Sequence, residues 1–181
     1  MLRLRVKDID FGMGYIVIRD GKGAKDRTTL LPKATIPELK NQLTVVKKIL
    51  DADVEKGIGP VYMPYQLEKK YPEAGRSLAW QYVFPSDNIS QDPRANIMRR
   101  HHVYSTTLQV HVKRAIKSAR INKLASCHTF GHSFATRLLQ AKYDLKQIQT
   151  LMGHSDIRTT EIYLHVLDEL GDKVKSPLDF A

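Results

Sequence analysis

The sequence predicts an α+β domain that is mainly α-helical and carries a small antiparallel β-sheet near its N-terminus. Two β-favouring runs, residues 15–18 and 27–31, flank a glycine-rich segment, as the strands of a hairpin do. Most later segments instead carry apolar residues at intervals of three and four, the spacing of amphipathic helices. The chain has 181 residues, 42% of them hydrophobic, which suffices for one buried core. We therefore expect a single domain over residues 1–181.

The predicted hairpin joins its two strands through the segment DGKGAK, residues 20–25. Glycine and aspartate are favoured in such connections because they tolerate the backbone angles of tight turns. Lys22 and Lys25 fall within this segment, so the hairpin is expected to carry two ammonium groups at its tip.

A long helix is predicted to follow, beginning at Pro37 and ending at Gly57. Proline is favoured in the first turn of a helix, Thr35 is a plausible N-cap, and Glu38 places a negative charge in the first turn. We expect this helix to face the core through its regularly spaced apolar residues, which are Leu39, Leu43, Val46, Ile49, Leu50 and Val54.

Residues 59–104 are expected to be irregular because five prolines interrupt them. Within this segment, the sequence favours a short helix around residues 67–71 and a short extended piece at residues 81–84. The composition is compatible both with a surface excursion without consequence and with an insert that sets specificity.

Four helical segments are predicted in the remainder of the chain. Residues 106–120 form an amphipathic pattern whose basic side chains lie off the apolar stripe. Helices are also expected over residues 126–141 and 145–152. After the break at Gly153, Ser155 or Asp156 can cap a final helix that runs to His165, followed by a tail over residues 165–181.

The net charge of +10 is concentrated in one part of the chain. Residues 93–143 contain ten lysines and arginines and no acidic residue, and removing those ten from the total of 29 leaves 19 basic against 19 acidic residues. A solvated face normally mixes both signs, so we favour a polyanionic partner, most simply nucleic acid. The candidate DNA-binding residues are Lys25, Arg99, Arg100, Lys113, Arg114 and Lys117.

The sequence shows no apolar run long enough to cross a bilayer, and its first ten residues lack the apolar block of a signal peptide. Cys127 is the single cysteine, which excludes an internal disulfide framework. These features suit a reducing, cytoplasmic setting in which the chain associates with DNA and not with a membrane.

The stretch CHTFGHSFAT, residues 127–136, allows several chemical interpretations. His128 and His132 share a helical face and could bind a metal, but Thr129 stands where zinc proteases carry glutamate, and no further ligands complete a site. Cys127 beside His128 could suggest a thiol nucleophile, although sequence neighbours on a helix point in different directions. Further along, Tyr163 alone is best read as a half-buried core residue.

Taken together, four blocks resemble the tyrosine recombinase (phage integrase) family in order and spacing. They are GKGxK at residues 21–25, HTxxHSFAT at 128–136, LMGHS at 151–155 and TTxxYxH at 159–165. The chain is most similar to the integron integrases, whose extra helical insert corresponds to about residues 62–84 and whose tail resembles VKSPLD near the C-terminus.

The resemblance implies the catalytic fold of this family and a reaction that cuts and rejoins DNA without metal or other cofactor. Tyr163 matches the nucleophile that forms a 3′-phosphotyrosyl link, and Lys22 matches the lysine that protonates the leaving 5′-oxygen. His128 and His154 match the two histidines of the phosphate site, whereas His132 matches no direct catalyst. The implied partners are recombination sites of double-stranded or folded single-stranded DNA, bound by a homotetramer.

Two departures from the family pattern imply that this chain is impaired. Gly131 occupies the position of the family's second arginine, three residues after His128, and the segment that carries its first arginine lies upstream of Met1. Guanidinium groups bind phosphate oxygens through paired hydrogen bonds, so both losses weaken transition-state binding. The alternatives are a catalytically inactive DNA-binding remnant and a metal-dependent nuclease built on the histidines; the integron-like insert argues against a type IB topoisomerase.

Overall fold

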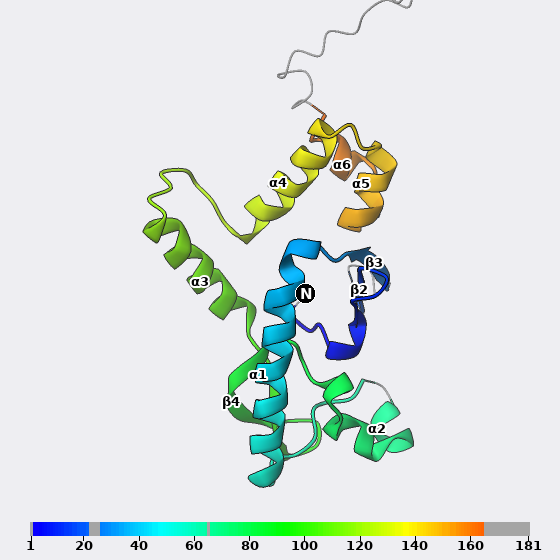
Figure 1. Ribbon diagram of the computed structural model, residues 1–181, viewed down its shortest axis with the longest axis vertical. Helices are drawn as coiled ribbons and strands as arrows, with labels where there is room; N and C mark the ends of the chain where they lie inside the picture. The colour runs from blue at the N-terminus through cyan, green and yellow to red at the C-terminus, as the bar shows by residue number, and fades with distance from the viewer. Residues whose placement is uncertain (1, 22–25, 65, 165–181) are drawn as a thin grey trace, which may run out of the picture. The chain divides into compact units, whose positions relative to one another are not determined.

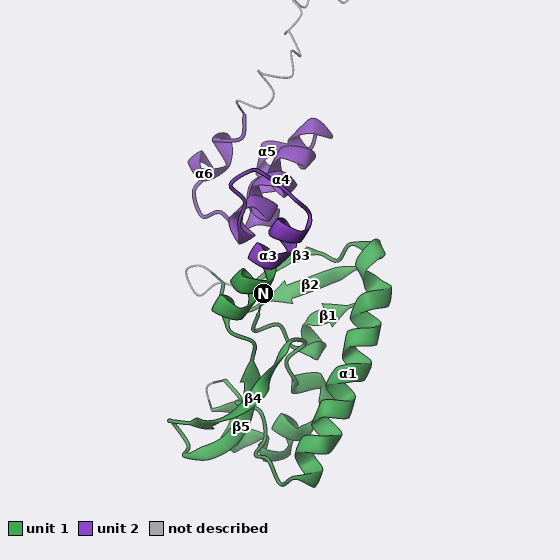
Figure 2. Cartoon of the chain, turned by 90° about the vertical axis from the view of Figure 1, so that its left-hand side faces the viewer, with its two compact units in different colours: residues 1–111 green, residues 112–181 purple. Residues whose placement is uncertain are grey.

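The computed structural model describes residues 2–21, 26–64 and 66–164 (Figure 1). The chain divides into two compact units, residues 1–111 and residues 112–181, which Figure 2 distinguishes by colour. Among the described residues the helices are the main elements and the two sheets are small and antiparallel. The predicted mainly helical α+β fold class is therefore confirmed.

The first unit contains the predicted hairpin as part of a three-stranded sheet. Strands β2 (Tyr15–Ile18) and β3 (Arg27–Leu30) pair antiparallel, with Tyr15 opposite Leu30, which confirms the prediction. The short strand β1 (Ile9–Asp10) adds to the other edge of β2 and was not expected from the sequence. Lys22 and Lys25 lie outside the described residues.

Helix α1 (Ile36–Glu55) confirms the long helix, and Thr35 occupies its N-cap position as predicted, but the Thr35 side chain makes no capping hydrogen bond. Thr35 closes a 3₁₀ turn, η2 (Lys33–Thr35), and its hydroxyl donates to the carbonyl of Pro32 at 2.8 Å instead of accepting from the helix. The core-facing prediction holds for Val46, which is 2% exposed, and fails for Val54, which is 48% exposed.

One hydrophobic cluster joins this sheet to α1 and to the chain after it. Its buried members are Leu4, Ile9, Ile16, Leu31 and Val83, and Leu39 and Leu43 of α1 pack against them. Val83 lies in the predicted extended piece, whose backbone bonds to residues near the start of the chain: Val83 donates to Leu4 and Val6 donates to Gln81. That piece therefore belongs to the core although it forms no regular strand.

The segment between α1 and the second sheet consists of short turns and helices. Helix α2 (Leu67–Lys70) confirms the predicted short helix. Two 3₁₀ helices follow α2 in this segment, η3 (Pro72–Arg76) and η4 (Leu78–Trp80). A further 3₁₀ helix, η1 (Val6–Asp8), lies near the start of the chain.

A second hairpin lies where the sequence predicted irregular chain. Strands β4 (Pro85–Asp92) and β5 (Ile97–His102) pair antiparallel, with a register shift between Pro85 and Ile89. The strand PSDNISQD is mostly polar and lacks regular alternation, so its pairing leaves little trace in the sequence.

The boundary between the two units falls within helix α3 (Ser105–Ser118), and the described part of the second unit also contains helices α4 (Cys127–Gln140), α5 (Leu145–Met152) and α6 (Arg158–Glu161). All four confirm predicted segments, but the last helix ends at Glu161 and not at His165 as expected, because residues 162–164 form turns; His165 itself lies outside the described residues. Ala135, Leu139, Ile148 and Tyr163 form the buried core of α4, α5 and the segment after α6.

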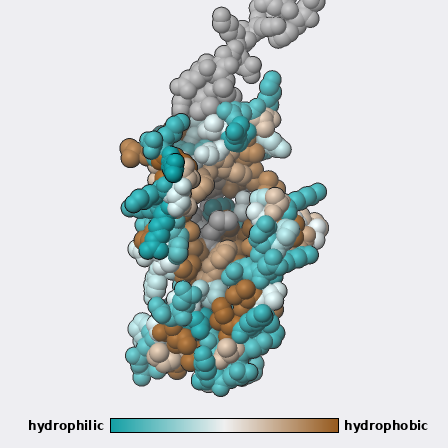
Figure 3. Space-filling model, turned by 60° about the vertical axis from the view of Figure 1, so that its left-hand side comes forward, coloured by the Kyte–Doolittle hydropathy of each residue, from teal (hydrophilic) through white to brown (hydrophobic). Residues whose placement is uncertain are grey.

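The described surface mixes polar and apolar side chains. Figure 3 shows brown hydrophobic residues interspersed among teal hydrophilic ones on one face. Helices α3 and α4 contribute exposed apolar residues, including Leu108, Phe130 and Phe134. In the described residues, no helix is both long and apolar enough to span a membrane.

Candidate active site

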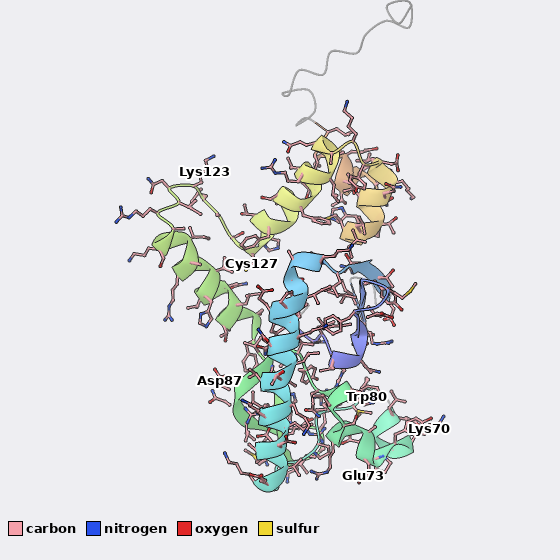
Figure 4. All side chains as sticks on the ribbon, viewed as in Figure 1. Lys70, Glu73, Trp80, Asp87, Lys123 and Cys127 are labelled. Atoms are coloured by element: carbon pink, nitrogen blue, oxygen red, sulfur yellow. The ribbon has the colours of Figure 1, made fainter. Side chains whose placement is uncertain are left out.

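The N-terminus of α4 is built by a reciprocal cap. The hydroxyl of Ser126 accepts from the backbone N–H of His128 at 3.2 Å, and the backbone N–H of Ser126 donates to the hydroxyl of Thr129 at 2.9 Å. Such a capping box satisfies N–H groups that a helix start otherwise leaves unpaired. Figure 4 shows Cys127 at the start of this helix, after the loop that carries Lys123. Thr129, which stands where zinc proteases carry glutamate, thus has a structural role as a member of this cap.

The cap places His128 in the first turn of α4, where it is exposed, and His132 one turn further. Partial positive charge gathers at the start of a helix, which favours binding of an anion there. His132 instead contacts Tyr163: the two ring centroids are 5.3 Å apart and the ring planes meet at 68°.

Gly131 lies in the second turn of α4 in regular helical backbone. A Cβ atom at this position would lie 3.6 Å from the terminal methyl carbon of Met152, which is an ordinary van der Waals contact. The described structure therefore leaves room for a Cβ atom at position 131.

The loop after α5 presents His154. Gly153 ends the helix in a left-handed conformation, with φ 70° and ψ 34°, which glycine adopts without steric cost. The backbone N–H of His154 donates to the carbonyl of Gln149 at 3.1 Å, and the side-chain amide of Gln149 donates to the carbonyl of His154 at 3.0 Å. Gln149 is buried, so the backbone of His154 is held from both sides.

The imidazole of His154 is held by Thr160. The Nδ1 atom lies 2.9 Å from the hydroxyl oxygen of Thr160, a fully buried residue of α6. The carbonyl of Thr160 also accepts from the backbone N–H of Tyr163 at 3.1 Å. One threonine thus connects the predicted phosphate histidine to the predicted nucleophile.

Tyr163 itself is 6% exposed and belongs to the hydrophobic core of this unit. The prediction of a core residue is therefore confirmed, while the role of Tyr163 as nucleophile stays a prediction. The sequence places Thr160 in the TTxxYxH block but indicates no role for it. The contact of Thr160 with His154 was therefore not predicted.

Lys113, Arg114 and Lys117 of α3 are exposed, as the prediction of a DNA-binding face requires. The described helix α3 contains no buried residue. These cations are therefore available to a partner, and they remain candidates for contact with phosphate.

Arg99 is fully buried, in contrast to its predicted place on a DNA-binding surface. Its guanidinium lies 3.1 Å from Glu68 of α2 and 3.5 Å from the buried Asp92 of β4. Charged groups without solvent need such partners, and these contacts join α2 to the second hairpin.

Arg100 is also committed within the fold. Its Nε and Nη2 atoms donate to the two carboxylate oxygens of Asp53 at 2.6 and 2.7 Å, and Nη1 donates to the carbonyl of Ser86. The hydrogen bond with Asp53 raises the pKa of Arg100 further above its usual value. We therefore remove Arg99 and Arg100 from the candidate DNA-binding surface.

A cavity of about 200 Å³ lies in the first unit between the sheet and the second hairpin. Arg5 lines it and is buried; it donates to the carbonyls of Trp80 and Tyr62 at 2.6 and 2.7 Å, and its guanidinium stacks 4.5 Å from the ring centre of Tyr82. Burial lowers the pKa of His101, another lining residue. The guanidinium of Arg5 is thus committed to contacts within the first unit.

The described residues contain no group of three or more histidine, cysteine, aspartate or glutamate side chains placed to hold a metal ion. His128 and His132 therefore have no third ligand within that part of the chain.

The described structure thus brings His132, His154, Thr160 and Tyr163 together in one compact unit. His128 stands at the start of the same unit's helix α4, and Gly131 is one turn along. Lys22, the predicted general acid, lies outside the described residues.

The second unit thus combines a core tyrosine, a loop histidine and a capped helix that carries two histidines. Comparison of the whole sequence with known protein families shows which class of protein has this fold. Residues 1–169 match the model of the phage integrase family. The chain belongs to this family.

Two curated relatives illustrate the similarity. An integrase/recombinase from Escherichia coli is 48% identical over 178 residues, which cover 98% of this chain and 53% of the relative. The tyrosine recombinase XerD of Agrobacterium fabrum is 33% identical over 155 residues, covering 86% of this chain and 40% of the relative. The chain spans about half the length of the curated relatives it matches.

Solved structures show the same fold. The XerA recombinase matches 97% of this chain and 52% of its own with a TM-score of 0.64 at 22% identity. The XerH site-specific recombinase bound to a palindromic difH substrate matches 95% of this chain and 40% of its own with a TM-score of 0.57 at 24% identity. The predicted tyrosine recombinase catalytic fold is therefore confirmed.

Proposed function

We propose that this chain is the catalytic part of a site-specific recombinase that cuts and rejoins DNA through a 3′-phosphotyrosyl intermediate. The observation that carries the proposal is the connection of His154 to Tyr163 through Thr160, within one compact unit of a phage integrase family member. Positioning and charge stabilisation supply most of the catalysis of phosphoryl transfer, and a histidine held in place by the segment that carries the tyrosine supports the positioning.

In the proposed reaction, the hydroxyl oxygen of Tyr163 attacks a backbone phosphorus while its proton passes to solvent water. The bond to the 5′-oxygen breaks, Lys22 delivers a proton to that oxygen, and a free 5′-hydroxyl results. His128 and His154 donate hydrogen bonds to the phosphate oxygens. The phosphotyrosyl bond conserves the energy of the phosphodiester, so attack by a 5′-hydroxyl reverses the step and rejoins DNA without a cofactor.

Tyr163 is largely buried in the described structure, so the packing around its ring holds it in place. Its ring contacts His132 edge to face and packs with Leu139 and Ile148. Any movement of the ring away from this packing would cost apolar contacts.

We propose further that Gly131 impairs this chain. An arginine three residues after His128 would add a guanidinium to the phosphate site, and glycine supplies none. By analogy with arginine fingers in other phosphoryl transfers, its loss lowers the rate by about 10³- to 10⁵-fold. The same observation supports the alternative proposal, a DNA-binding remnant without chemistry.

The proposed partner is a recombination site of double-stranded or folded single-stranded DNA, contacted by the exposed cations of α3 and by Lys25. By the integron-like pattern of residues 62–84, we propose integron-type recombination by a homotetramer on DNA, in the bacterial cytoplasm. The short helix α2 within residues 62–84 supports the proposal that these residues form a helical insert.

A nicked suicide substrate tests the proposal. Cleavage of this DNA releases a short fragment, so the covalent adduct accumulates and is measured on a denaturing gel. We expect a weak adduct from the wild-type chain, an increase of at least 10-fold in Gly131→Arg, and none in Tyr163→Phe, the matched control that keeps the ring. A strong wild-type adduct would contradict the impairment.

DNA binding without an adduct in any variant would instead support the inactive remnant. Repeating the assay with a chelator separates the third alternative: loss of cleavage on chelation would indicate a metal-dependent nuclease, whereas unchanged adduct formation excludes it. If Gly131→Arg cleaves no faster than wild type, Gly131 is not the lesion.

A further inference from the structure

Thr160 occupies an unusual place for a hydroxyl group. Its side chain is fully buried in α6, yet its Oγ1 atom lies 2.9 Å from Nδ1 of His154, on the loop that follows α5. In the described part of the chain, Nδ1 of His154 is the sole hydrogen-bond partner of this hydroxyl. The backbone groups of Thr160 bond separately to Ile157 and Tyr163.

The direction of this hydrogen bond follows from the burial of Thr160. If Nδ1 of His154 carried the proton and donated it, the hydroxyl hydrogen would be left buried without an acceptor, which costs about 1–3 kcal/mol. If the hydroxyl donates to Nδ1, both groups are satisfied. The second arrangement requires a bare Nδ1, and a neutral imidazole then carries its proton on Nε2.

We infer that Thr160 is a positioning residue that fixes His154 in the Nε2–H tautomer and orients its ring. The inference rests on the proposed function in one respect: the Nε2–H group is the donor that a phosphate oxygen requires. Histidines that bind a metal are oriented in the same way by a hydrogen bond to the second ring nitrogen.

The position of Thr160 also couples the histidine to the nucleophile. Thr160 and Tyr163 are three residues apart and joined by the bond from the Tyr163 N–H to the Thr160 carbonyl. A movement of this segment that carries Tyr163 therefore also moves the hydroxyl that orients His154. The correct tautomer and the nucleophile are thus presented by one short stretch of chain.

Nitrogen-15 NMR of the histidine side chains tests the inference in the 181-residue chain without DNA. At a pH above about 8, where an ordinary imidazole is neutral, we expect His154 to show a protonated Nε2 and a bare, hydrogen-bonded Nδ1. Thr160→Ser, which keeps the hydroxyl, should preserve this pattern. Thr160→Val keeps the shape without the hydroxyl and should shift the Nδ1 resonance and reveal the second tautomer.

A protonated Nδ1 in the wild-type chain would overturn the inference, and so would an unchanged spectrum in Thr160→Val. Because the wild-type spectrum alone is decisive, the test stands even if Thr160→Val fails to fold. His154→Phe assigns the resonance.

Adduct formation on the suicide substrate adds a second readout in the Gly131→Arg background. By analogy with outer partners of metal-binding histidines, Thr160→Val should lower its rate about 10- to 100-fold, with rescue in Thr160→Ser. Equal rates in all three chains would contradict a positioning role. Absence of any adduct would count against the proposed function, while the NMR result would still decide the role of Thr160.

Discussion

Replacing Gly131 with alanine should stabilise this protein, although the position belongs to the candidate active site. The residue lies within α4, and its backbone is regular helix with no positive φ. Alanine is favoured over glycine in a helix interior by about 1 kcal/mol because it loses less backbone freedom on folding. Among the described residues, the added Cβ meets only Met152 Cε within 4 Å, at 3.6 Å, so no steric cost from them opposes this gain.

Gly153→Ala is the matched control because it makes the same chemical change in the same unit. Gly153 has a φ of 70°, where a side chain costs roughly 1–2 kcal/mol. The two variants should therefore differ by about 2–3 kcal/mol in the free energy of unfolding, with opposite signs relative to wild type.

Urea denaturation followed by circular dichroism measures both effects. With a slope of about 1–3 kcal/mol per molar urea, Gly131→Ala should raise the midpoint by about 0.3–1 M. A lower midpoint for Gly131→Ala would mean that position 131 needs glycine for folding. In that case Gly131 could no longer be interpreted as the loss of the family's arginine side chain from an otherwise intact site.

Three further predictions concern the cap, the buried charges and the basic helix. Ser126→Ala removes the hydroxyl that accepts from His128 and should destabilise the chain by about 1 kcal/mol in the same urea assay. Burial raises the pKa of Asp92, but hydrogen bonds from Arg94 outweigh it and leave the pKa below its usual value. The unfolded chain therefore takes up this proton first, so stability should fall as the pH drops below about 4, and less steeply in Asp92→Asn when midpoints are compared across pH. Lys113→Gln should reduce the dependence of log K for DNA on log salt by about 1 in a binding titration, and an unchanged slope would remove it from the interface.

Local patterns were enough to predict most helices of this chain. Helix α5 was predicted with its observed bounds, because apolar spacing and the glycine that ends the helix both lie within a few neighbouring residues. The cap at Ser126 was within the predicted boundary for the same reason. The hairpin of β2 and β3 was likewise indicated by its own turn.

Elements that depend on distant partners were missed. The hairpin of β4 and β5 has a polar strand, so its pairing and burial were not visible as alternation. Arg100 was assigned to a DNA-binding surface because it lies in a run of positive charge. Such a run does not show which of its residues pair within the fold, and Arg100 pairs with Asp53, 47 residues away.

For the candidate site, the sequence by itself determined the residue types and the family: the spacing of His128, His154 and Tyr163 sufficed for the resemblance, and Gly131 stood out as the departure. Only the tertiary structure decided which cations remain available, because burial and ion pairing arise between residues far apart in the chain. It also decided that the hydroxyl of Thr160 meets the ring of His154, since a hydrogen bond between a loop and the next helix depends on how the chain folds back on itself.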